Sequence, residues 1–208
     1  MVLQFLNLTR DSILVPFGIN PTLFIFEIMD IIIMSFAIGY IFSSFLKRPT
    51  PKDYDPLKHY GKSATWEQLK FATMVAAPAV VLHELAHKFV AMGFGAKAVL
   101  YAPYGFYLLV ILLKAIGFPF IFLVGGFVSH GPLPALQSSL VSIAGPLTNF
   151  LIWGGILLLI KTDKLKKKYY TFAVPLARIS LFLGIFNMLP LPGFDGFNFF
   201  ASIFKAIF

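Results

Sequence analysis

Cysteine is absent from this chain of 208 residues, and charge is scarce and one-sided. Without cysteine the chain has no disulfide bond and no thiolate metal site, so any metal ion must be held by His, Asp or Glu. Charged residues make up 12%, with 17 Lys and Arg against 9 Asp and Glu. Many of the basic residues gather in two clusters, at 47–62 and 161–168, beside apolar runs. Such clusters usually contact lipid headgroups, so we expect no nucleic-acid partner.

Long polar stretches are lacking as well. Hydrophobic residues make up 58% of the chain, which is more than a soluble domain of this length can bury. No polar stretch is long enough to build a separate soluble domain. We therefore expect the lipid bilayer to act as the solvent, and residues 1–208 to form a single membrane-embedded domain with nothing appended.

Four apolar runs are long enough to cross a bilayer, whose hydrocarbon core needs about 20 apolar residues in a helix. They lie near residues 23–46, 66–92, 136–160 and 171–189. These runs predict an all-α polytopic membrane protein with about four to six transmembrane helices. We expect an integral, multi-pass protein of the cell membrane.

The segment 97–130 is apolar but interrupted by proline and glycine, so it does not resemble one clean helix. Its β-branched and aromatic residues near Val99–Tyr104 favour a strand. We predict a small re-entrant β-hairpin here, with one or two short spans as the alternative. If the segment returns to its starting side, both lysine-rich clusters lie on one side of the membrane, whereas an extra span would separate them.

Two further pairs of polar residues lie outside these patterns. Glu27 and Asp30, at i and i+3 in the first run, could line a water path, pair with Arg178 or seal a structural contact. His59 and His130 fall in predicted loops, where a lone histidine is more often solvated than bound to a metal. We assign these two histidines no role.

The most informative motif is His83-Glu84-Leu85-Ala86-His87, which has the form HExxH. Histidines at i and i+4 project from one face of a helix, so both imidazoles can reach one metal ion and leave Glu84 beside it. The motif lies inside the second apolar run, where each ionisable group costs several kcal/mol. Three such groups in about one helical turn therefore indicate a functional site.

A third metal ligand is needed, and Asp195 is the best candidate. It follows the fourth run, where Pro190 and Pro192 oppose a regular helix and Gly196 permits a close approach of the backbone. Two signatures in this order resemble the site-2 family of intramembrane zinc metalloproteases. The second signature of that family is matched at its spacing by Asn187, Pro190, Asp195 and Gly196.

The segment 142–149, which ends at Asn149, also resembles a stretch that the family carries between its two signatures. The resemblance covers roughly residues 76–196, and 104–134 matches poorly. It implies one Zn²⁺ per chain, bound by His83, His87 and Asp195. It further implies that Glu84 is the general base and that a water or hydroxide is the nucleophile.

The resemblance implies a transmembrane protein as substrate, cleaved within or near its membrane segment. The peptide groups of a helix are closed off by its internal hydrogen bonds, so the substrate must become extended before cleavage. The strand near Val99–Tyr104 could then pair with the extended substrate by β-augmentation. Asn149 and Asn187 are candidate donors to the oxyanion or to the substrate, although an Asn inside a membrane is as often an interhelical contact. Oligomeric state is left open.

Two alternatives belong to other functional classes. A transporter or an ion or proton relay could use His83, Glu84 and His87 without needing Asp195. An inactive protease-like scaffold could bind membrane partners only. Other metalloenzymes fit less well, because di-iron desaturases need more than the four histidines present and no glutamate follows Glu84 to act as the third ligand of a soluble zincin.

Overall fold

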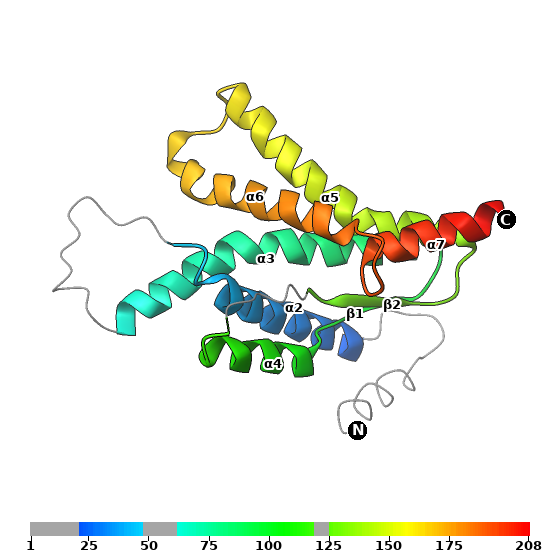
Figure 1. The fold of residues 1–208 in the computed structure, drawn as a ribbon, viewed down its shortest axis with the longest axis horizontal. Coiled ribbons are helices and arrows are strands. Elements are labelled where there is room, and N and C mark those ends of the chain that lie inside the picture. The colour runs from blue at the N-terminus through cyan, green and yellow to red at the C-terminus, as the bar shows by residue number, and fades with distance from the viewer. Residues whose placement is uncertain (1–20, 48–61, 119–124) are drawn as a thin grey trace.

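The computed structural model describes residues 21–47, 62–118 and 125–208. Its elements are helices, apart from one pair of short strands (Figure 1). Four helices are long: α2 (Pro21–Phe42), α3 (Lys62–Gly93), α5 (Ala135–Lys161) and α6 (Tyr170–Asn187). The shorter elements are β1 (Ala98–Tyr101), α4 (Tyr104–Ala115), β2 (Phe127–His130), the 3₁₀ turn η1 (Lys167–Tyr169) and α7 (Asp195–Ile207).

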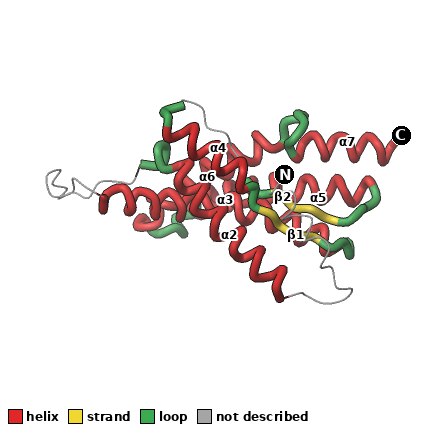
Figure 2. The backbone as a smooth tube through the Cα atoms, turned by 90° about the horizontal axis from the view of Figure 1, so that it is seen from below, coloured by secondary structure: helices red, strands yellow, loops and turns green. Residues whose placement is uncertain are grey.

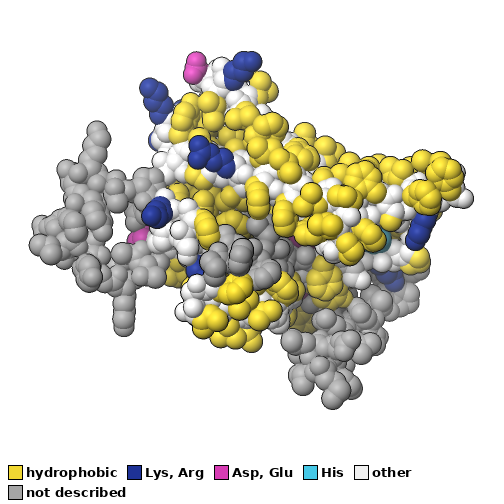
Figure 3. All heavy atoms as spheres, viewed as in Figure 1, with side chains coloured by type: hydrophobic (Ala, Val, Ile, Leu, Met, Phe, Trp, Pro, Cys, Tyr) yellow, Lys and Arg dark blue, Asp and Glu magenta, His cyan; other side chains and the backbone are white. Residues whose placement is uncertain are grey.

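The four long helices contain stretches that are long and apolar enough to cross a membrane: Ile25–Phe42, Trp66–Gly93, Ala135–Lys161 and Lys167–Asn187. The predicted fold class, an all-α polytopic membrane protein with a small β-hairpin, is confirmed. Apolar side chains cover much of the visible face along α5, α6 and α7, and many of the basic side chains gather toward the end where α5 joins α6 (Figure 3). That distribution suits helices whose sides face lipid and whose ends face water.

The segment between α3 and α5 contains the predicted pair of strands together with a short apolar helix. β1 and β2 pair antiparallel, from Ala98 opposite His130 to Tyr101 opposite Phe127 (Figure 2). Between them lies α4, an apolar helix of 12 residues, about 18 Å long and too short to span a bilayer. His130 ends β2, so its prediction as a loop residue is wrong, while His59 lies outside the described residues.

This segment returns to the side on which it begins, because α3 ends and α5 starts at the same end of the molecule (Figure 1). The α5–α6 connection with the second lysine-rich cluster lies at the opposite end, together with the start of α3. Most of the first cluster, residues 48–61, is outside the described residues. The ends of α2 and α3 that flank it nevertheless lie on the same side as the second cluster.

Glu27 and Asp30 seal structural contacts between α2 and the hairpin segment. Glu27 pairs with Lys88, and its Oε1 accepts a hydrogen bond from the backbone N–H of Leu100 in β1 at 3.0 Å. Asp30 accepts a hydrogen bond from the Tyr104 hydroxyl at the start of α4. Arg178, which was predicted as one partner for these acids, is exposed on α6. The acids therefore hold the outer edge of β1 and the start of α4 against α2.

The core lies where α2 and α3 meet β1, around Met34, Ile38, Val75, Ala79 and Leu100, each at most 1% exposed. On the other face of α3, α6 and α7 follow one another along α5, separated by the irregular residues 188–194 (Figure 1). A broken helix of this kind is tolerated inside a membrane only where it is packed against protein or lines a cavity. The break delivers the first residue of α7 to the middle of α3.

Candidate metal centre

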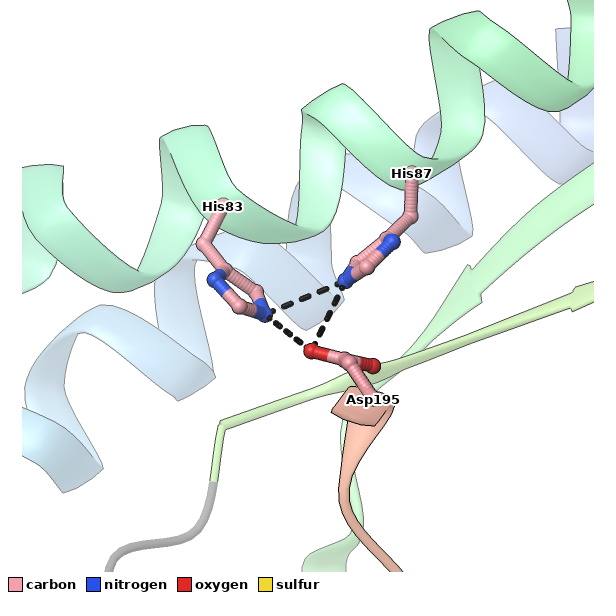
Figure 4. Close-up of side chains that lie close together, drawn as sticks. All are labelled: His83, His87 and Asp195. Carbon is pink, nitrogen blue, oxygen red and sulfur yellow. Dashed lines mark hydrogen bonds and ion pairs between the residues drawn. The ribbon is translucent and has the colours of Figure 1, made fainter. Parts of the chain in front are cut away.

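His83 and His87 project from one side of α3 toward Asp195, which begins α7 (Figure 4). The Nε2 atoms of the two histidines lie 3.1 Å apart. Asp195 Oδ2 lies 3.0 Å from His83 Nε2 and 3.2 Å from His87 Nε2. Two histidines four positions apart and an aspartate more than 100 positions later thus present one atom each to a single point.

Asp195 reaches this point because the chain turns sharply before α7. Gly193 has a φ of 94°, a conformation that glycine adopts without strain, and Gly196 packs so closely that an added Cβ would lie 2.7 Å from the carbonyl oxygen of Leu189. Burial acts to raise the pKa of Asp195, but hydrogen bonds and charge interactions with His83 and His87 hold it below its usual range. The carboxylate is therefore ionised at neutral pH.

The three ligand atoms fit a small divalent ion. Tetrahedral coordination at roughly 2.1 Å from nitrogen or oxygen places ligand atoms about 3.4 Å apart, near the 3.0–3.2 Å between these three. His87 Nδ1–H donates to the carbonyl oxygen of Val141 at 2.7 Å, so Nε2 is the ring atom left to bind a metal ion at the same point. His83, His87 and Asp195 could hold a metal ion.

Glu84 lies beside this point and is held by the segment that enters β2. Its side chain is 5% exposed, and the backbone of Gly126 hydrogen-bonds to it. The neighbouring Gly125 must lack a side chain, because an added Cβ would lie 2.6 Å from Glu84 Oε1. The Tyr107 hydroxyl in α4 donates to the carbonyl oxygen of Gly125 at 2.9 Å, which fixes the backbone against Glu84.

Helix α5 packs against both histidines. Val141, Gly145 and Asn149 are spaced by four and fall along one side of the helix. Val141 bonds to His87, Asn149 lies 3.1 Å from His83 Nδ1, and Gly145 lies between the two rings. An added Cβ on Gly145 would lie 2.6 Å from His83 Nε2, so only glycine lets α5 approach this closely.

A cavity of about 640 Å³ opens in front of the centre. Its lining includes Glu84 and Asn187, together with three polar residues that sequence analysis did not assign to the site, Ser142, His130 and Asn198. Asn198 lies three residues after Asp195 on α7, and that helical spacing could have revealed it. The backbone acceptor at Val141 has no sequence signal. Asn149, in contrast, is fully buried behind His83.

Comparison with known proteins supports a metal site. The chain is similar to two proteins of Methanocaldococcus jannaschii that are named as zinc metalloproteases, MJ0611 (provisionally) and MJ0392. It is 33% identical to MJ0611 over 117 residues, which are 56% of this chain and 61% of that protein. It is 32% identical to MJ0392 over 130 residues, which are 62% of this chain and 31% of that protein.

The chain is similar to zinc metalloproteases over part of its length. The predicted resemblance to the site-2 type of these enzymes is thereby supported. The matched region spans less than two thirds of the length of either relative. No protein-family model matches the chain, and no solved structure matches it. The candidate metal centre of this chain is formed in part by apolar helices that are long enough to cross a bilayer.

Proposed function

We propose that this protein is an intramembrane zinc metalloendopeptidase that hydrolyses a peptide bond within or near the transmembrane segment of a membrane-protein substrate. Its role would be regulated intramembrane proteolysis in the cell membrane. The observation that carries the proposal is the convergence of His83, His87 and Asp195 beside the buried Glu84, between helices that can span a membrane. One zinc ion per chain satisfies this donor set.

The donor set favours zinc because two imidazoles and one carboxylate are the ligands of known catalytic zinc sites, with a fourth position left open. When bound, zinc supplies a Lewis acid that activates water and polarises a carbonyl oxygen. Charge also supports the fit, since one dication balances Asp195 and Glu84 and lowers the cost of burying each. His87 Nε2 and the Asp195 carboxylate are already directed at the site.

Glu84 is suited to act as the general base. It lines the cavity one residue from His83, so it can take a proton from a water molecule in the centre and pass it to the leaving nitrogen of the cleaved peptide. The bond from Gly126 holds the carboxylate in place during both transfers. Asn187, which also lines the cavity, is a candidate donor to the oxyanion or to the substrate backbone.

An extended substrate fits the edge of β2 better than the edge of β1. Glu27 accepts the bond from Leu100 N–H, so the main chain of Leu100 points away from β2 and the outer edge of β1 is covered. In an antiparallel pair, Val128 opposite Leu100 must then direct its own N–H and C=O toward the outer edge of β2. Val128 lines the cavity, so a substrate strand added there lies beside Glu84.

The relay predicted as an alternative function accounts for less of this geometry. A proton or ion relay needs the polar cluster of α3 but does not need Asp195 at 3.0 Å from His83. It also gives no reason for a separate helix, α7, to begin at this point. The names of both relatives favour the protease.

The proposal is tested by comparing Glu84→Gln with Glu67→Gln, a matched change of a partly exposed glutamate on the same helix. Each protein is purified in detergent, its zinc content is measured, and it is incubated with a panel of single-span transmembrane proteins whose cleavage is followed by mass spectrometry. We expect wild type and Glu67→Gln to carry about one zinc and to cleave a substrate.

Glu84→Gln should keep its zinc but lose activity by about 10²- to 10⁴-fold, because only the proton transfer is removed. A wild-type protein without zinc, or a Glu84→Gln variant as active as wild type, contradicts the proposed function.

A further inference from the structure

Asn149 carries a buried side-chain amide in which one polar atom has a hydrogen-bond partner and the other has none within the described residues. Its side chain is 0% exposed on α5, and Nδ2 donates a hydrogen bond to His83 Nδ1 at 3.1 Å. Within the described residues, its Oδ1 has no hydrogen-bond partner. A buried unpaired carbonyl oxygen costs roughly 1–3 kcal/mol, so this arrangement calls for an explanation.

Metal binding through Nε2 would require His83 Nδ1 to donate a hydrogen bond, whereas in this structure Nδ1 accepts one. Its Nε2 faces His87 Nε2 and Asp195 Oδ2, so Nε2 is the atom that can bind a metal. A neutral imidazole that binds through Nε2 carries its proton on Nδ1 and must donate from there. Asn149 then has to offer an acceptor. A half turn of the amide about its last side-chain bond exchanges Nδ2 and Oδ1 with little change of shape.

We propose that Asn149 is a positioning residue for the metal centre, whose Oδ1 accepts a hydrogen bond from His83 Nδ1–H and so fixes the tautomer and orientation of that ring. This inference rests on the proposed metal site. It assigns to Asn149 a hydrogen bond to the metal ligand His83, in place of the predicted contact with the oxyanion or the substrate.

A parallel contact at His87 supports the assignment. The His87 ring donates from Nδ1 to the carbonyl oxygen of Val141, an atom that can only accept. Val141 and Asn149 lie on the same side of α5, one on each side of Gly145. The same helix thus provides one acceptor for each histidine, and the ring-to-helix spacing is set by the missing side chain of Gly145. Partners of this kind typically change metal affinity by about 10- to 100-fold.

The decisive experiment compares Asn149→Asp with Asn149→Leu. Asp keeps an acceptor oxygen and has no donor, whereas Leu keeps the approximate size and has neither. Zinc affinity is measured by competition with a chelator at fixed pH, and the visible spectrum of the Co²⁺-loaded protein reports the ligand field. Ser180→Ala is the matched control, because it removes another fully buried polar group, whose hydroxyl has no hydrogen-bond partner within the described residues, from a neighbouring helix.

We expect Asn149→Asp to bind zinc as tightly as wild type or more tightly, with a shifted cobalt spectrum, because a carboxylate makes the ring a stronger ligand. Asn149→Leu should bind zinc about 10- to 100-fold more weakly. Ser180→Ala should match wild type in affinity and spectrum. If Asn149→Leu does not fold, Asn149→Asp against wild type still decides the matter.

Wild-type affinity in Asn149→Leu, or a loss in Asn149→Asp at least as large as that in Asn149→Leu, overturns the inference. Failure of the proposed function looks different. A wild type that binds zinc but cleaves no membrane protein refutes the protease while Asn149→Asp and Asn149→Leu still test the positioning role. A wild type that binds no zinc overturns both.

Discussion

The side of the metal centre formed by α3 and α5 differs from the side formed by the loop before α7 in how its ligands are held. The side chains of His83 and His87 are 6% and 8% exposed, and each ring contacts α5 through Nδ1. Asp195 is 23% exposed and follows seven irregular residues, 188–194. Packed helices therefore fix the two histidines, whereas the carboxylate depends on a turn that faces the cavity.

This difference suggests a division of tasks. Ligands that are oriented before the metal arrives lose little freedom on binding, which strengthens the site. A carboxylate at the start of a helix that follows a loop can adjust when substrate enters, at some cost in affinity. The histidine side should therefore determine whether the metal binds, and the aspartate side should make the smaller contribution to metal affinity. Three changes test this comparison, taken here from the largest expected effect to the smallest.

The largest effect should come from removing a ligand on the packed side. We expect His83→Ala to weaken zinc binding by more than about 100-fold, and Asp195→Ala to weaken it by about 10- to 100-fold, because two oriented histidines remain in the second variant. Chelator competition on detergent-purified protein measures both. Equal losses, or a larger loss for Asp195→Ala, would show that the two sides do not differ as described.

A smaller effect should follow from Gly145→Ala, which disturbs the packed side without removing a ligand. The new Cβ would lie 2.6 Å from His83 Nε2, so the helices or the rings must move apart. We expect zinc affinity to fall by roughly 10-fold and the free energy of unfolding to fall by about 1–3 kcal/mol.

Gly154→Ala on the same helix is the control for Gly145→Ala, because its Cβ would meet nothing within 4 Å. It should keep wild-type zinc affinity and be as stable or up to about 1 kcal/mol more stable. Equal behaviour of the two variants in zinc titration and thermal unfolding would contradict close packing at Gly145.

The smallest effect should come from Gly193→Ala on the loop side. Its φ of 94° disfavours a residue with a Cβ by about 1–2 kcal/mol, and this strain lies two residues before Asp195. We expect zinc affinity to fall only a few-fold, since both histidines stay in place. Gly131→Ala, at a glycine without positive φ and with open space, is the control. A loss above that of Gly145→Ala would reverse the ranking of the two sides.

Local patterns made much of the fold predictable. The four long helices follow from apolar runs, because a membrane-spanning segment must satisfy its own backbone hydrogen bonds. The convergence of His83 and His87 follows from their i, i+4 spacing. Asp195 was predictable because it lies at the break after the fourth run and matches a family signature. The strand near Val99 was recognisable from its β-branched residues, but its pairing with β2 across the intervening α4 was not.

Within the centre, the amino-acid sequence alone determined which groups are present: two histidines on one helical face, a glutamate beside them, a carboxylate after a helix break, and no cysteine. Only the tertiary structure decided that Asp195 Oδ2 lies 3.0 Å from His83, that Val141 and Asn149 stand behind the rings, and that Glu27 covers β1 while the edge of β2 lies along the cavity. The reason is physical. Helical spacing and hydropathy depend on near neighbours in the chain, whereas these contacts depend on how closely separate elements approach. Between α3 and α5 that distance is set by the absence of a side chain at Gly145.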